Sequence, residues 1–237
     1  MLQDNLIYIA IIALVGAAAL FINYFITRQE HNTSMKNSRL GWLQTRTLHT
    51  LDAITALRSA GCKPDILEKL NQHAMVLIEE ISLLAPDSDL MTQVNNQKET
   101  ADRTAPGTAQ FTSDKELKRF QIYINFTEKL LAEMLKKGKL SQALARNYGQ
   151  ELYWLNLTVV AEAHISQGQR HLHDNDPLTA LSHFKHAKAV IVRAMVPQIK
   201  KQPLLDRIQP MIEEIQPNKT ANAGTLADSL DNFLKER

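Results

Sequence analysis

Residues 161–194 read AEAHISQGQRHLHDNDPLTALSHFKHAKAVIVRA, and this stretch carries the most structural information in the chain. Its apolar residues recur at spacings of three and four, which is the period of an amphipathic helix rather than of a strand. The pattern breaks at DNDP and restarts, with Asp176 suited to an N-cap and Pro177 to a first helical turn. We therefore predict an antiparallel helical hairpin, and the scarcity of strand patterns elsewhere predicts an all-α chain.

Four residues of the stretch are spaced like the packing positions of a tetratricopeptide (TPR) repeat, so the segment resembles one such repeat. The small members would let two antiparallel helices approach closely, and the aromatic one would fill the seam between them. The predicted packing residues are Gly168, Ala180, Phe184 and Ala187.

The resemblance has limits. His164, Gln167 and His171 stand where the family has Trp, Leu and Tyr, and Pro197 comes later than the family's closing proline. A weaker match to the later positions of the same repeat occurs at Ala74, Ile78, Ile81 and Pro86. Because repeat arrays need about three units to bury a continuous core, we expect TPR-like packing rather than a long solenoid. The alternative is a helical hairpin that merely contains small residues.

The resemblance to the TPR family implies a protein-binding role on a concave face built from the first helix of each repeat. Mapped by position, the residues expected to contact a protein partner are Glu162, Ile165, Gln169 and Leu172.

The N-terminal residues predict a membrane anchor. Leu6–Ile26 reads LIYIAIIALVGAAALFINYFI and contains no charged residue. A helix of about twenty residues crosses a hydrocarbon core of about 30 Å, and Tyr8 and Tyr24 lie near its two ends, where aromatic rings favour the interface. The alternative is a cleaved signal peptide, which would need a positive n-region, whereas MLQDN carries only Asp4.

The charges that flank this segment predict its orientation. Arg28, Lys36, Arg39 and Arg46 follow the segment, and no Lys or Arg precedes it. The positive-inside rule then places the C-terminal part in the cytoplasm. We expect a single-pass protein of the bacterial inner membrane.

Composition excludes several classes of protein. The 237 residues include 27 basic and 25 acidic side chains, and a net charge of +2 argues against a dedicated nucleic-acid binder. The single cysteine, Cys62, excludes an internal disulfide framework. GxxxxGK[ST], GxGxxG and GxSxG motifs are absent, so we expect neither an enzyme nor a cofactor.

Five parts of the chain differ in character. Residues 1–27 are the predicted transmembrane anchor, and 28–86 a membrane-proximal helical hairpin. Residues 87–112 are rich in Asn, Gln and Thr and predict a flexible linker, within which a short helix around Leu90 would fit. Residues 113–217 form the predicted TPR-like domain, and 218–237 a tail with a short amphipathic helix.

Capping signals predict helix boundaries in detail. Ser113 with Glu116 has the spacing of a capping box, and Gly61 and Gly138 suit the residue after a helix end. Three later prolines predict that the end of the domain is cut into short helical pieces: Pro203, Pro210 and Pro217.

Two groups of side chains have the composition of a reactive site, one of a Cys–His nucleophile and one of a zinc site, but we expect neither activity. Cys62 shares the first hairpin with His49 and His73, and a Cys–His pair can act as a nucleophile. We interpret Cys62 instead as a buried thiol at a helix–helix turn. A histidine cluster would suit zinc, but we interpret it as surface and seam residues: His164, His171, His173, His183 and His186.

We therefore expect a membrane-anchored adaptor or scaffold that binds a protein partner, without nucleic acid, cofactor or metal. The alternative is a structural protein that self-associates through its membrane-proximal helices, in envelope assembly or division. An enzyme with an unrecognised helical site is a further alternative. A basic stretch over 185–201 would meet lipid or an acidic partner, or would simply be a solvated face.

Overall fold

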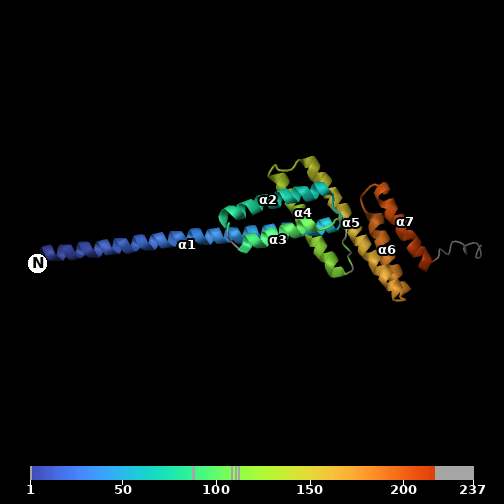
Figure 1. Cartoon of the computed structure of the whole chain (residues 1–237), viewed down its shortest axis with the longest axis horizontal. Helices are drawn as coiled ribbons and strands as arrows, with labels where there is room; N and C mark the ends of the chain where they lie inside the picture. Colours follow the sequence, from blue (N-terminus) through green and yellow to red (C-terminus); the bar gives the residue numbers. More distant parts are fainter. Residues whose placement is uncertain (1, 87–88, 108, 110, 112, 217–237) are drawn as a thin grey trace, which may run out of the picture. The chain divides into compact units, whose positions relative to one another are not determined.

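The computed structural model describes residues 2–86, 89–107, 109, 111 and 113–216, with side chains from residue 21 onward except 22, 25, 26 and 30–33. The described residues form seven α-helices and no strand, which confirms the all-α prediction (Figure 1). The helices are α1 (Leu2–Ser59), α2 (Pro64–Leu84), α3 (Asp89–Arg103), α4 (Asp114–Lys136), α5 (Gln142–His173), α6 (Pro177–Arg193) and α7 (Gln198–Ile215).

Among the described residues, no helix is both long enough and apolar enough to cross a membrane. The predicted span Leu6–Ile26 falls within α1, but most of its side chains lie outside the described residues. The anchor therefore stays a prediction.

The described helices divide into two compact units. One unit contains residues up to 51 together with 70–102, and the other contains 52–69 together with the chain from 103 onward. Both α1 and α2 therefore contribute to each unit, because their buried stripes continue along the helix past the boundary. This division differs from the predicted one, which separates the chain at a linker over 87–112.

Helix α3 lies within the predicted linker and contains Leu90, where a short helix would fit. It extends to Arg103, so the remainder of Asp89–Arg103 is helix rather than flexible linker. Val94 and Ala101 are seven positions apart on one face of α3 and are both buried. Two small or medium apolar residues among Asn, Gln and Thr give a weak sequence signal, yet they are enough to define a packed face.

Helix α7 is continuous through Pro203 and Pro210, so the predicted short pieces are wrong here. The two prolines are seven positions apart on the exposed face of α7. Each removes a hydrogen bond to the carbonyl four residues earlier, at Ile199 and Asp206, which are also exposed. Water can reach these carbonyls, while Ile208 on the opposite face stays buried. The predicted tail helix over 225–234 lies outside the described residues.

The predicted helix caps are confirmed in the second unit. Ser113 and Glu116 form a complete capping box at the start of α4, and Asp176 accepts a hydrogen bond from the Thr179 backbone at the start of α6. Gly138 follows α4 with a φ of 69°, in the left-handed region that favours glycine. These caps define the two turns that place α4, α5 and α6.

Helices α5, α6 and α7 surround one apolar core, and α4 packs on α5 (Figure 1). Antiparallel packing places the partly buried residues of α7 against the cluster formed by α5 and α6. The fully or nearly buried members of this core are Ala161, Ile165, Ala180, Phe184, Ala187, Ile191, Ile208 and Ile212.

Candidate functional site

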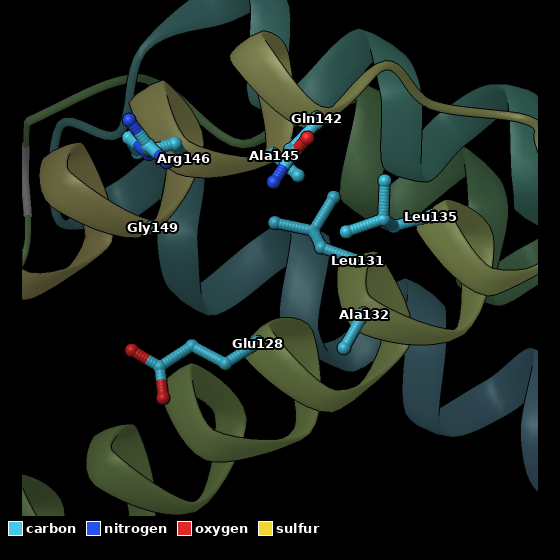
Figure 2. A pocket seen from close by; sticks show the side chains of 8 residues that line it. All are labelled: Glu128, Leu131, Ala132, Leu135, Gln142, Ala145, Arg146 and Gly149. Atoms are coloured by element: carbon cyan, nitrogen blue, oxygen red, sulfur yellow. The ribbon is translucent and has the colours of Figure 1, made fainter.

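An open groove of about 390 Å³ lies between α4 and α5 (Figure 2). Each helix contributes four lining residues at positions i, i+3, i+4 and i+7, which is one helix face. We call it the α4–α5 groove. Its lining from α4 is Glu128, Leu131, Ala132 and Leu135, and its lining from α5 is Gln142, Ala145, Arg146 and Gly149.

The groove stays open because α5 contributes small or polar residues where a packed helix pair would have large apolar ones. Leu131 and Leu135 lie between the two helices, and Ala145 faces them from α5 (Figure 2). A Cβ atom placed at Gly149 would meet no other atom within 4 Å, so that wall of the groove borders open space. The result is an open groove in which Leu135 and Ala132 are exposed, Ala145 is half-buried and Leu131 is buried.

Two opposite charges lie at the groove, Glu128 on α4 and Arg146 on α5 (Figure 2). Neither has an ion-pair or hydrogen-bond partner within the part of the chain that the structure describes. Partial burial raises the pKa of the Glu128 carboxyl above its usual value, because it loses water without gaining a cation. A cationic group entering the groove would stabilise the ionised carboxylate.

The four predicted packing residues lie together in the seam between α5 and α6, where all are buried. A Cβ atom at Gly168 would come within 2.6 Å of the Phe184 ring. The absence of a side chain at Gly168 is therefore what lets the ring lie against the α5 backbone, while Ala180 and Ala187 leave room on α6.

The predicted contact face is largely covered by α7. Ile165 is only 3% exposed, and Leu172 packs against the same core. Glu162 accepts a hydrogen bond from Arg207 on α7, and of the four residues only Gln169 is exposed. Ile165 therefore belongs to the core, not to an open face, because α7 occupies the side that an incomplete repeat array would expose. A partner-binding role for the others stays a prediction.

Four of the five clustered histidines meet across the α5–α6 hairpin. His164 Nδ1 and His183 Nδ1 are 3.1 Å apart, and the His164 ring lies 4.2 Å from that of His186. His171 stacks on His183 with centroids 5.4 Å apart, whereas His173 is exposed at the end of α5. In the described part of the chain, no group of three or more potential ligands is arranged to hold a metal ion.

The histidine contacts favour neutral imidazoles. Burial, followed by the neighbouring His186 and His183, lowers the pKa of His164, with Asp114 acting in the opposite direction. Burial and the neighbouring His171 similarly lower the pKa of His183. Protonation of these rings would therefore oppose the packing of the hairpin.

Cys62 is buried in the turn between α1 and α2. Burial raises the pKa of its thiol to about 12, so the reactive thiolate is scarce at neutral pH. This environment does not suit a nucleophilic thiol paired with His49 or His73.

The α4–α5 groove was not predicted from the sequence. The signal was present as Gln142, Ala145, Arg146 and Gly149, a stripe without large apolar residues on a helix that follows a tight turn. Recognising it requires knowing that this stripe faces Leu131 and Leu135.

Comparison of the chain with protein-family models, with curated proteins and with solved structures finds no match. The TPR resemblance therefore rests on the residue spacing alone and stays a prediction.

Proposed function

We propose that the protein is a membrane-anchored adaptor that binds a segment of a partner protein in the α4–α5 groove. The groove carries this proposal, because it is an open hollow whose apolar lining, led by Leu135, is flanked by two unpaired charges. The proposal assigns binding rather than catalysis, and it requires neither a cofactor nor a metal.

The groove chemistry defines the partner segment. A leucine-sized side chain fits between Leu131, Leu135 and Ala145, and burying such a side chain contributes about 1.5–3 kcal/mol. A Lys or Arg beside it would pair with Glu128, whose desolvation is then offset by a close opposite charge. An acidic residue or a chain carboxylate would pair with Arg146 in the same way. The expected partner is a short segment with one large apolar residue flanked by charges.

The anchor is proposed on the uncharged run Leu6–Ile26, and the cytoplasmic placement on the four cations that follow it. A tether in the inner membrane would raise the local concentration of the helical domain near other membrane proteins. A groove that contributes a modest binding energy would then suffice for a stable complex.

Groove-filling substitutions test the proposal. Ala145→Trp places a large ring in the groove, whereas Ala143→Trp places the same ring on an exposed position of α5 outside it. After crosslinking in native membranes, proteins recovered with the wild-type chain should be lost with Ala145→Trp and kept with Ala143→Trp. Glu128→Lys should also reduce recovery. Equal recovery from all variants would reject the groove as the binding site.

A structural, self-associating role is the second candidate, because Met35 and Trp42 are exposed seven positions apart on one face of α1. Arg39 lies 4.7 Å from the centroid of the Trp42 ring and partly shields it. A Met35→Cys variant would form an intermolecular disulfide in membranes if α1 helices pair along this face. Absence of the disulfide-linked dimer would favour the adaptor role.

A further inference from the structure

The turn between α6 and α7 presents large apolar side chains to solvent. Met195 is 92% exposed and Ile199 is 83% exposed, and Val192 at the end of α6 is 51% exposed. We call these three residues, with Arg193, Lys200 and Lys201, the α6–α7 corner. Exposed apolar groups gathered in this way mark contact with a protein or a membrane.

The corner is held in a defined conformation. The Met195 backbone N–H donates a hydrogen bond to the Tyr153 hydroxyl on α5, at 3.2 Å. Ala194, between Met195 and the end of α6, is buried, and Pro197 caps the start of α7. The exposure of Met195 and Ile199 is therefore a property of the packed structure.

The same region is strongly basic. Residues 192–201, which span the corner, contain three Lys or Arg and no Asp or Glu. Lys201 Nζ donates to the Val192 carbonyl at 3.0 Å, which leaves its charge uncompensated. Lys200 Nζ lies 3.0 Å from Glu151, but that carboxylate is shared with Lys63 at 2.9 Å, so one positive charge of this trio remains. The exposed apolar side chains of the α6–α7 corner are thus accompanied by net positive charge.

We propose that the α6–α7 corner docks on an anionic lipid surface, with Met195 and Ile199 in the headgroup region and Arg193, Lys200 and Lys201 against lipid phosphates. Apolar side chains flanked by cations are the pattern of interfacial membrane contact. Side chains as exposed as Met195 and Ile199 can enter a fluid bilayer, which deforms around them, whereas a protein partner would need a matching concave site. This inference is independent of the groove.

A fluorophore at the tip tests the proposal in the full chain. Met195→Cys is labelled with the environment-sensitive dye NBD, while buried Cys62 stays unlabelled, as an identically treated wild-type sample verifies. Leu178→Cys, at the opposite end of α6 and 78% exposed, is the matched control. Both are reconstituted into vesicles of phosphatidylcholine alone or with phosphatidylglycerol.

The proposal predicts a blue shift of NBD emission at position 195 with phosphatidylglycerol, a smaller one in phosphatidylcholine, and none at position 178. About 1 M NaCl should reduce the shift, because it shortens the Debye length to about 3 Å. Arg193→Gln together with Lys201→Gln should reduce it as well. Unshifted emission at position 195 in both lipids would overturn the proposal, as would a shift that requires added membrane proteins.

Discussion

Two glycines on α5, Gly168 and Gly149, are nineteen positions apart and have opposite surroundings. A Cβ atom at Gly168 would come within 2.6 Å of the Phe184 ring, whereas one at Gly149 would meet nothing within 4 Å. The first glycine closes the seam with α6, and the second leaves the groove with α4 open. Helix α5 thus borders a sealed core on one side and the open groove with α4 on another.

The largest expected effect on the free energy of unfolding comes from removing the Phe184 ring from the core between α5 and α6. Phe184→Ala should lower the free energy of unfolding by about 3–5 kcal/mol, because it leaves a cavity in a core where Phe184 is fully buried. Chemical denaturation in detergent measures the change. Leu178→Ala, on the exposed face of the same helix, should change it by less than about 0.5 kcal/mol. Similar losses for both would mean that the seam is not tightly packed.

Adding one methyl group at the seam should have the next largest effect. Gly168→Ala should destabilise the protein by about 1–3 kcal/mol, although alanine favours helices, because the Phe184 ring occupies the space. In a Phe184→Leu background the same substitution should cost less, and a double-mutant cycle measures this coupling. A stabilising Gly168→Ala would contradict the close contact.

Acidification should weaken the α5–α6 hairpin. The pKa values of His164 and His183 are lowered by folding, so the unfolded chain binds more protons below the usual histidine value of about 6.5. The stability contributed by these neutral rings is therefore present above that pH and is lost as the pH falls through it. Thermal unfolding between about pH 7.5 and 5.5 measures the loss.

His183→Gln provides the matched control for this pH dependence. The variant removes a ring that contacts both His164 and His171. Its melting temperature should fall less than that of the wild type over the same pH range. An unchanged pH dependence would show that the cluster does not couple to folding.

The smallest effect is expected at the open groove. Gly149→Ala should stabilise the protein by up to about 1 kcal/mol, because alanine favours helices and the added methyl group meets no neighbour. Opposite signs for Gly149→Ala and Gly168→Ala in the same denaturation assay would establish the difference between the two sides of α5. A destabilising Gly149→Ala would mean that the groove is filled.

Local signals in the sequence were sufficient where a boundary depends on a few adjacent residues. The capping box at Ser113 and the Asp176–Pro177 helix start were predictable because each depends on chemistry within one turn. The length of helix α3 was missed because only Val94 and Ala101 define its buried face. Helix α7 was missed because the effect of Pro203 and Pro210 depends on which side of the helix faces solvent.

The candidate site was less predictable than the fold. The spacing of Gly168 and Phe184 indicated a close helix pair, but nothing in the sequence showed that α7 would cover Ile165. The α4–α5 groove depends on which stripes of two helices face each other, and this is a property of the tertiary structure. Opposed small residues could be recognised only after α4 and α5 had been placed.

A photocrosslinking amino acid at Gln142, within the groove, tests whether the α4–α5 groove binds a partner protein. We expect a discrete crosslinked product with a second protein in native membranes, and loss of that product when Glu128 is changed to Lys. The same amino acid at Gln169, on the predicted face beside α7, should give no such product. No product from Gln142, or the same product from Gln169 alone, would contradict the account.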